Sequence, residues 1–393
     1  MIWINPKTIT GPPAEGDKFL KRPYINQLFW DAIAKGEHVR FTAPRRVGKS
    51  SVMKNLEINS PENMIVIYQN IEADKSSQDF YKRLWSLIVS KLNTISYLSK
   101  KIGTLIKGRK LGEISMDGSF KIEEKNINYK EELLYLIEDL GKEKDKIVML
   151  LDEFPDVIVS ITKNEGAEIA TDVLHILRSI RHDAKFKNFT LVLAGSIGLE
   201  HVIASIDRLK LINDLKPIHI LALSNEEAKE LLSIQLEEAT MIIEEDMRDY
   251  LLKVVQHLMP YYIQLMIEEC NNIIYNNTKP FITKEIIDKA FETVISQNEN
   301  FADWEKRLKD YLSEQDYNYC IGLLTRCAHF NYTIQEAYNY SKTIKITSSY
   351  RELIDDVLIK DGYIFNNNNN LIFLSPFLQG WWKKRHEQFE IEQ

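Results

Sequence analysis

Cysteine is scarce in this sequence, and long apolar runs are missing from it. The 393 residues include three cysteines, Cys270, Cys320 and Cys327, an odd number without the spacing of metal ligands. This argues against a disulfide-stapled scaffold, and we expect reduced, buried thiols in a cytoplasmic protein. No apolar run approaches the roughly 20 residues that span a bilayer, so no membrane partner is expected.

Positive charge is also in short supply. The chain carries 50 lysines and arginines against 57 acidic residues, a net charge of -7, which gives no overall attraction to nucleic acid and leaves only local basic patches. Residues 1–6 lack a basic region followed by an apolar run, so we expect no signal peptide. What the chain does have is a globular composition, 44% hydrophobic and 27% charged, at a length that predicts two or three domains.

A phosphate-binding loop is predicted between a strand pattern at residues 37–41 and a helix pattern at residues 51–56. The P-loop consists of a glycine, four residues and Gly-Lys-Ser/Thr; here Gly48-Lys49-Ser50 is intact and Ala43 stands first. Backbone N–H groups make the phosphate cradle, so alanine is compatible with it. The alternative is a chance Gly-Lys-Ser in a basic turn. The predicted nucleotide contacts are Ala43, Pro44, Arg45, Arg46, Val47, Gly48, Lys49, Ser50 and Ser51.

Two acids follow the apolar run Ile147–Leu151, which predicts a strand buried on both faces of a parallel sheet. Ligands bind at the carboxyl ends of such strands, so Asp152 and Glu153 are expected beside the P-loop. We predict that Lys49 contacts the β- and γ-phosphates of ATP, that Ser50 and Asp152 hold Mg²⁺, and that Glu153 orients and deprotonates the attacking water. The alternative is that the acids merely cap the next helix.

Further strand patterns at residues 64–70, 189–196 and 216–223 alternate with helix patterns, which predicts an α/β fold, a P-loop NTPase core with a parallel sheet. Ser196 ends one of these strands, where it either senses the γ-phosphate and positions water or is an ordinary turn residue. Residues 96–130 are rich in Lys, Gly and Glu and predict an inserted, partly mobile and locally basic segment, for which a solvated loop is the favoured interpretation.

The remainder of the chain is predicted to be helical at first. Ser224–Glu227 is a capping box that opens a run of four helix patterns. From Asp303 onward, three helix patterns precede the hairpin pattern 362–374, with asparagines at its turn, which predicts a winged helix. The predicted domains are therefore an ATPase core (1–223, with 96–130 inserted), an all-α lid (224–300) and a winged-helix domain (301–393).

With these motifs in place, the sequence resembles the archaeal-type ATPases of the STAND/AAA+ group of P-loop NTPases and, more distantly, origin-recognition ATPases. The resemblance is carried by Ala43–Ser51, Leu150–Phe154, Leu193–Leu199, Pro260–Tyr262 and Leu374–Trp382. It implies an ATP-dependent switch with an ATPase core, a helical lid and a C-terminal winged helix. It also implies that Arg22 lies near the adenine and that Pro260 is the nucleotide-contacting proline of the lid, although Leu258-Met259-Pro260 replaces the usual Gly-x-Pro.

Arg178 and Arg181 lie on the helix pattern 167–182 and are candidates for an arginine finger, acting in cis or from a neighbouring subunit. The favoured alternative is a surface salt bridge, because most charged helix faces are simply solvated.

Three functions compete at this stage. The first is a slow, Mg²⁺-dependent ATPase that acts as a regulatory switch with a protein partner or through self-association. The third is an ATP-binding scaffold that hydrolyses little ATP; the presence of Asp152 and Glu153 argues against it. The second is an ATP-dependent DNA-binding regulator. The candidate recognition helix 349–361 has two basic residues against four acidic ones, which disfavours phosphate contact, whereas the tail Lys383–Arg385 leaves DNA binding open. We therefore favour a protein-interaction or autoinhibitory role for the winged helix.

Overall fold

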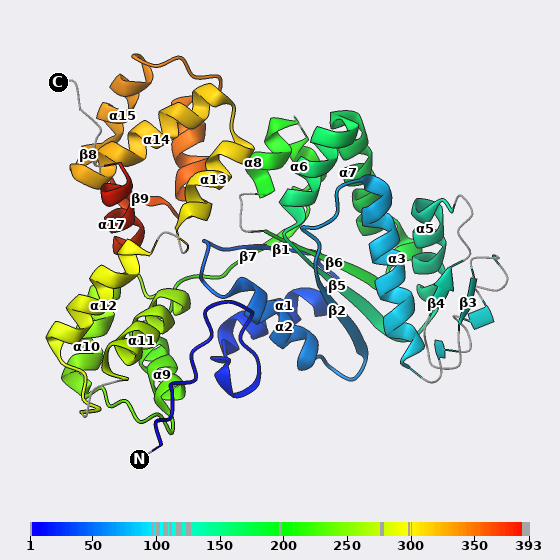
Figure 1. The fold of residues 1–393 in the computed structure, drawn as a ribbon. Helices are drawn as coiled ribbons and strands as arrows, with labels where there is room; N and C mark the ends of the chain where they lie inside the picture. The colour runs from blue at the N-terminus through cyan, green and yellow to red at the C-terminus, as the bar shows by residue number, and fades with distance from the viewer. Residues whose placement is uncertain are drawn as a thin grey trace.

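The computed structural model describes residues 2–95, 98–99, 103–104, 109, 112–114, 120–122, 127–195, 199–206, 208–275, 279–297, 299 and 301–386. Its centre is a five-stranded, all-parallel sheet with the strand order β2-β5-β6-β1-β7 (Figure 1). The strands are β1 (Val39–Thr42), β2 (Met64–Asn70), β5 (Lys146–Asp152), β6 (Phe189–Ala194) and β7 (Lys216–His219). The predicted parallel α/β core is confirmed.

Helices cover both faces of this sheet, and the alternation of side chains along the strands decides which face each residue serves. Val148 and Leu150 pack towards α1 and α2, whereas Ile147, Met149 and Leu151 pack towards the helices of the other face. The core helices are α1 (Pro23–Ala34), α2 (Lys49–Ile58), α3 (Ser77–Asn93), α5 (Tyr129–Leu140), α6 (Phe154–Glu165), α7 (Ala167–His182) and α8 (Leu199–Ser205). The central strands are thus buried on both sides, as the apolar run predicted.

The predicted insert contains a short antiparallel pair, β3 (Gly112–Ile114) and β4 (Phe120–Ile122), which the sequence did not predict. It lies beyond α3 and α5, at the edge of the core away from the C-terminal half (Figure 1). Most other residues of the insert are outside the described part of the chain. Arg109, one of its basic residues, donates a 2.7 Å hydrogen bond to Glu132 on α5.

Four helices follow the sheet: α9 (Asn225–Leu236), α10 (Glu245–Val255), α11 (Pro260–Ile274) and α12 (Lys284–Ser296). We call them the lid. Its first helix begins at the predicted capping box, in which Ser224 and Glu227 exchange side-chain and backbone hydrogen bonds. Leu223 donates its backbone N–H to Leu258 at 2.9 Å and so ties the entry of the lid to the turn before α11.

Residues 301–386 form what we call the C-terminal module. Its elements are α13 (Ala302–Tyr311), α14 (Glu314–His329), β8 (Tyr332–Thr333), α15 (Ile334–Ser341), α16 (Tyr350–Glu352), the π-helix η5 (Leu353–Ile359), β9 (Ile364–Asn367), β10 (Asn370–Phe373) and α17 (Pro376–Arg385). The strands form an antiparallel sheet in the order β8-β10-β9. The hairpin turn is tighter than predicted: only Asn368 and Asn369, both with positive φ, connect the strands. The winged-helix assignment stays a prediction.

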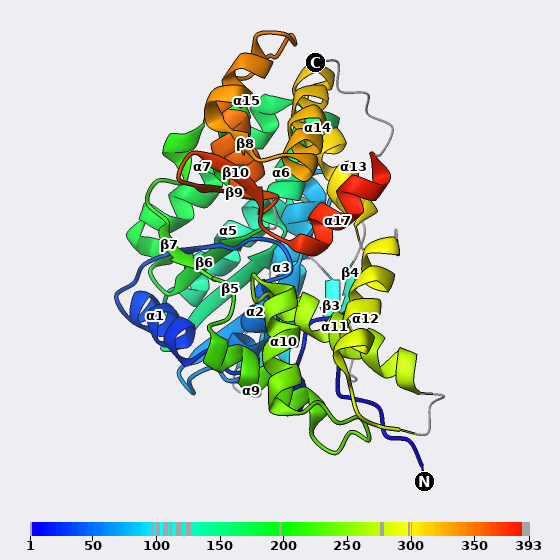
Figure 2. The same ribbon diagram turned by 90° about the vertical axis from the view of Figure 1, so that its left-hand side faces the viewer.

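The lid and the C-terminal module share one hydrophobic core. Tyr262 on α11 stacks on Phe377 of α17 with ring centroids 4.9 Å apart, and Phe291 of α12 reaches the same ring at 4.9 Å. Figure 2 shows α17 lying between α12 and the three-stranded sheet. A displacement of the lid therefore carries the C-terminal module with it, since separating them would expose these rings.

Two smaller predictions can also be compared with the structure. Cys270, Cys320 and Cys327 are free and buried, as predicted, and burial raises the pKa of Cys270 and of Cys327 to about 12. None of the described helices combines the length and the apolar character that crossing a bilayer requires.

Candidate active site

The P-loop connects β1 to α2, and its backbone has the shape that anion binding requires. Arg46 and Gly48 both have positive φ, 69° and 88°, so successive N–H groups turn towards the same side. Gly48 is the N-cap of α2, and the positive end of the helix dipole therefore faces the loop. A side chain at Gly48 would be strained at this φ, which accounts for glycine here. Ala43, at the head of the loop, does not have a positive φ, so alanine is compatible with its backbone conformation.

The side chains of Lys49 and Ser50 converge on the end of β5. Lys49 Nζ forms an ion pair with Asp152 and lies 3.4 Å from Glu153 Oε1, while Ser50 Oγ donates a 2.6 Å hydrogen bond to Asp152 Oδ2. Lys49 is 7% exposed and Asp152 is fully buried. Burial alone would lower the pKa of Lys49, but the Glu153 and Asp152 carboxylates outweigh it and raise the pKa above its ordinary value. Lys49 is therefore a fixed cation at the centre of the site.

Glu153 sits on a strained backbone. Its φ of 58° places a non-glycine residue in the left-handed region at the junction of β5 and α6, and its N–H donates to Asp152 Oδ1 at 3.0 Å. Such strain persists only where the surroundings enforce it, and it is concentrated at functional sites. The conformation places Glu153 at the wall of the cleft described next, where a carboxylate can meet a water molecule.

Tyr68 is a site residue that the sequence did not reveal. Its hydroxyl donates to Asp152 Oδ2 at 3.2 Å, and burial together with Asp152 raises the pKa of the phenol. The pairing of β2 with β5 would have placed Tyr68 near Asp152, because Tyr68 lies opposite Leu150 and Asn70 lies opposite Asp152. The Asp152 carboxylate therefore contacts the side chains of Lys49, Ser50 and Tyr68 as well as the backbone N–H of the next residue, and these contacts fix its orientation.

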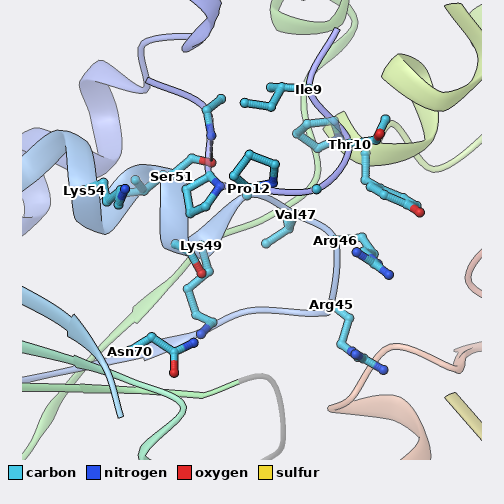
Figure 3. Close-up of a pocket in the computed structure, with 18 of the residues that line it drawn as sticks. Ile9, Thr10, Pro12, Arg45, Arg46, Val47, Lys49, Ser51, Lys54 and Asn70 are labelled. Carbon is cyan, nitrogen blue, oxygen red and sulfur yellow. Dashed lines mark hydrogen bonds between the residues drawn. The ribbon is translucent and has the colours of Figure 1, made fainter. Parts of the chain in front are cut away.

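A cleft of about 830 Å³ opens above these groups. Its size falls in the range of pockets that enclose whole small-molecule ligands. It is bounded by the P-loop, the N-terminal segment 9–14, the lid and α13. Figure 3 shows Lys49 reaching from α2 towards Asn70, with Pro12 on the opposite side of the loop.

The N-terminal segment, which the sequence indicated only as an irregular lead-in, is a wall of this cleft. The Ala14 N–H donates to Ser51 Oγ at 2.9 Å, and the Ile9 N–H donates to Gln264 Oε1 of α11 at 2.9 Å (Figure 3). Further along, Lys7 donates its backbone N–H to the carbonyl of Gln235 at 2.8 Å. The segment therefore attaches both to the helix after the P-loop and to the lid.

Arg22 and Pro260 both line the cleft, as the resemblance implied. The guanidinium of Arg22 forms an ion pair with Glu227 of the lid at 3.0 Å and donates a hydrogen bond of 3.1 Å to the carbonyl of Leu221, in the segment before the lid. Pro260 is the first residue of α11, and its Cγ lies 4.0 Å from the position that a Cβ would take on Gly48. Their nucleotide contacts stay predictions.

Arg45 and Arg46 point away from the centre of the loop, towards the C-terminal half of the chain (Figure 3). Arg45 donates to Asp303 Oδ2 at 3.1 Å and lies 5.1 Å from the Trp304 ring, whereas Arg46 lies 4.1 Å above the ring of Tyr261. Both residues line the cleft, and their phosphate contacts stay predictions. Their observed contacts connect the P-loop to α13 and to the lid.

The structure does not bring Arg178 and Arg181 to the cleft of their own chain. Arg181 holds Asp214 with two hydrogen bonds of 2.7 and 3.0 Å, and Arg178 donates to Asn213 Oδ1 at 3.2 Å and to the Lys210 carbonyl. The salt-bridge alternative describes both side chains, because α7 packs them against the segment before β7. Ser196 lies outside the described residues.

Sequence comparison matches most of the core to a family model. Residues 36–203 match a family model described as an AAA domain, a span that includes the P-loop, Asp152 and Glu153. The AAA+ group of P-loop ATPases proposed from the sequence is thereby supported for the core, whereas a STAND affiliation has no such support. Comparison with curated proteins gives no match.

Among the solved structures that this chain resembles, two match it along almost its whole length. A Walker-type ATPase of Pyrococcus abyssi shares 15% identity with a TM-score of 0.65, covering 95% of this chain and 98% of that one. The ORC2 protein of Aeropyrum pernix, solved as ADPNP–ADP complexes, shares 12% identity with a TM-score of 0.54, covering 96% and 94%. At such identities the likeness concerns the fold, and it extends beyond the core to the C-terminal half.

Proposed function

We propose that this protein is an ATP-binding and ATP-hydrolysing regulatory switch whose nucleotide state is coupled to the lid and the C-terminal module. One observation carries the coupling: the P-loop touches both of them. Arg46 stacks on Tyr261 of the lid, and Arg45 binds Asp303 of α13. The backbone of Gly362 also approaches the loop so closely that an added Cβ would lie 2.9 Å from Pro44 Cβ. A loop that reshapes around phosphates acts on each of these contacts.

The donor set suits Mg²⁺ and a triphosphate. Ser50 Oγ and Asp152 Oδ2 are adjacent hard oxygens, which is the ligand type that Mg²⁺ prefers. Bound Mg²⁺ would neutralise charge on the β- and γ-phosphates. Lys49, now paired with Asp152 and Glu153, would turn its ammonium to those phosphates, and this exchange would release Glu153 from the ion pair.

The reaction assigned to this site is hydrolysis of the terminal phosphoanhydride. Water attacks the γ-phosphorus while the bond to the β–γ bridging oxygen breaks, giving ADP and phosphate. Glu153 orients the water and accepts its proton, and Lys49 stabilises charge on the transferred group. We infer slow turnover, because the ion pairs of Lys49 and the contacts of Arg45 must rearrange in each cycle.

The coupling is tested with Gly362→Ala. We expect wild type to release phosphate from ATP only with Mg²⁺, and Gly362→Ala to change that rate at least about threefold, since a methyl group at φ 85° meets Pro44 and strains the contact by about 1–3 kcal/mol. Steady-state phosphate release is the measurement.

Gly166→Ala is the matched control, because Gly166 has a φ of 98° but nothing within 4 Å of an added Cβ. If both variants change turnover alike, backbone strain alone explains the result and the coupling is rejected. Absence of ATP binding and hydrolysis by wild type would reject the proposed function itself.

The alternative, an ATP-dependent DNA-binding regulator, is disfavoured by the surroundings of its basic residues. Lys360, at the end of η5, lies 2.6 Å from Glu200 of α8 and 2.8 Å from Asp356. In the tail, Lys384 is paired with Glu292 at 3.1 Å, and Arg385 lies 3.5 Å from a glutamate of α13. These cations are already neutralised within the chain, so the C-terminal module fits a protein-interaction or autoinhibitory role better.

We therefore expect no sequence-selective binding of duplex DNA at physiological salt. The measurement is a gel-shift titration at several salt concentrations, with and without ATP. Selective binding that falls steeply with salt would favour the DNA regulator instead, because phosphate contacts release counterions.

A further inference from the structure

A buried charge cluster joins the C-terminal module to the helix after the catalytic acids. Asp156 lies one turn beyond Glu153 on α6. Tyr311, at the end of α13, donates its hydroxyl hydrogen to Asp156, and Arg307 Nη2 lies 3.5 Å from Asp156 Oδ1. Arg307 also lies 6.0 Å from the ring centroid of Tyr311. Figure 1 shows α13 on the side of the core where α8 and α6 lie.

This cluster lines the nucleotide cleft. Arg307, Tyr311 and Asp156 all line it, and Glu153 and Glu72, which also line it, are close enough to act electrostatically on Asp156. The side chain of Arg307 is 14% exposed. Burial alone would lower its pKa, but the negative charges of Asp156 and Glu153 raise the pKa above the ordinary value. The guanidinium is therefore a permanent cation next to the proposed catalytic glutamate.

Asp156 is a weak partner for that cation. Its contact with Arg307 is longer than the roughly 2.7–2.9 Å of a charge-assisted hydrogen bond. Its second oxygen, Oδ2, is buried without a hydrogen-bond partner in the described structure. Burial also raises the pKa of Asp156 to about 6, so the ionised carboxylate is poorly stabilised. A better anion can take Arg307 away from it.

The lid supplies no such cation. Helix α11, whose first residues Pro260 and Tyr261 line the cleft, contains neither lysine nor arginine over its described length. The other lid residues that line the cleft, Leu231 and Gln264, are uncharged. On this side of the cleft, positive charge comes from α13, and Arg307 is its buried part.

We propose that Arg307 binds the γ-phosphate of ATP held in the same chain, and that Asp156 holds Arg307 when that phosphate is absent. The proposal rests on the proposed ATPase function and names the residue through which the C-terminal module distinguishes a nucleoside triphosphate from a diphosphate. A guanidinium binds phosphate with two parallel N–H donors, a stronger arrangement than the 3.5 Å contact with Asp156. Tyr311 keeps its hydrogen bond to Asp156 after the exchange, so the carboxylate is not left alone.

The first test compares a triphosphate with a diphosphate. With Arg307→Ala in the full-length chain, we expect a non-hydrolysable ATP analogue to bind at least about tenfold more weakly, because a charged hydrogen-bond donor is lost, and ADP to bind within twofold of wild type. Calorimetric titration with Mg²⁺ is the measurement. Arg307→Gln is the second variant in case the alanine variant does not fold. Lys309→Ala is the control, since Lys309 is exposed on the same helix and does not line the cleft.

The second test uses the partner carboxylate. Asp156→Asn keeps the size of the side chain and a partner for Tyr311 but releases Arg307, so we expect it to bind the analogue more tightly than wild type. In the Arg307→Ala background the same substitution should have no effect. A gain that persists without Arg307 would show simple charge repulsion by Asp156 and would overturn the exchange.

Two other outcomes of the first test would reject the role of Arg307. Equal weakening of ADP and analogue binding by Arg307→Ala would mean that Arg307 only docks α13, and unchanged binding of both would mean that it does not reach the nucleotide; either overturns the inference while leaving the ATPase function intact. If wild type binds neither nucleotide, the proposed function and the inference fail together.

Discussion

Replacing Glu153 with glutamine is expected to lower the ATP turnover number by about 10²–10⁴-fold, the usual contribution of a general base. Glutamine has the same shape and retains hydrogen-bonding capacity, but it cannot accept the proton of the attacking water. The substitution leaves the P-loop, Lys49 and the Ser50–Asp152 hydrogen bond in place. ATP affinity should therefore stay within about threefold of wild type, where one lost negative charge slightly favours binding.

The measurement pairs steady-state phosphate release with calorimetric titration of ATP. Glu62→Gln is the matched control, because Glu62 is an exposed acid in the turn before β2 and lies away from the cleft. A Glu153→Gln enzyme with the wild-type rate would show that another group activates the water. Loss of affinity equal to the loss of rate would instead make Glu153 a binding residue.

Replacing Lys49 with alanine is expected to weaken ATP binding by roughly a hundredfold or more, because two charged contacts to phosphate are lost. The variant should also be less stable. Lys49 is paired with a fully buried carboxylate, and removing one member of a buried pair typically costs about 3–5 kcal/mol. Ser50 and Tyr68 still donate to Asp152 and keep the cost towards the lower end.

Thermal unfolding with and without Mg²⁺–ATP measures both effects. Wild type should be stabilised by ATP, since a ligand that binds only the folded state raises its stability, and Lys49→Ala should start lower and gain nothing. Lys35→Ala is the control, an exposed lysine at the end of α1. Stabilisation of the alanine variant by ATP to the wild-type extent would contradict the assignment of the P-loop as the nucleotide site.

The centre of the site could be predicted because its signals are local. Gly48-Lys49-Ser50 and Asp152-Glu153 each lie at the junction of a strand and a helix, and a parallel sheet brings such junctions to one edge. The αL conformation of Glu153 could not be predicted, since nothing in the neighbouring residues requires it. The asparagine-rich turn was recognised, but its length depended on the pairing of β9 with β10.

The walls of the cleft could not be predicted, because they depend on packing between distant segments. Tyr311 and Asp156 are 155 residues apart, and Ile9 and Gln264 are 255 apart. No periodicity encodes which helix docks on which. The arginines illustrate the same limit: Arg178, Arg181 and Arg307 all lie on amphipathic helices, and only tertiary contacts show that Arg307 faces the cleft.

The attachment of the N-terminal segment has a mechanical consequence. The chain passes between the core and the lid at two places, once through Leu221–Ser224 and once through residues 7–14, and each crossing is hydrogen-bonded at both ends. Two crossings define an axis, and rotation about that axis stretches neither. Because the C-terminal module shares its core with the lid, such a rotation would move η5 and α13 together with the lid. The contacts of Arg307 and Tyr311 on α13 with Asp156 on α6 would have to break in such a rotation, and all three residues line the cleft.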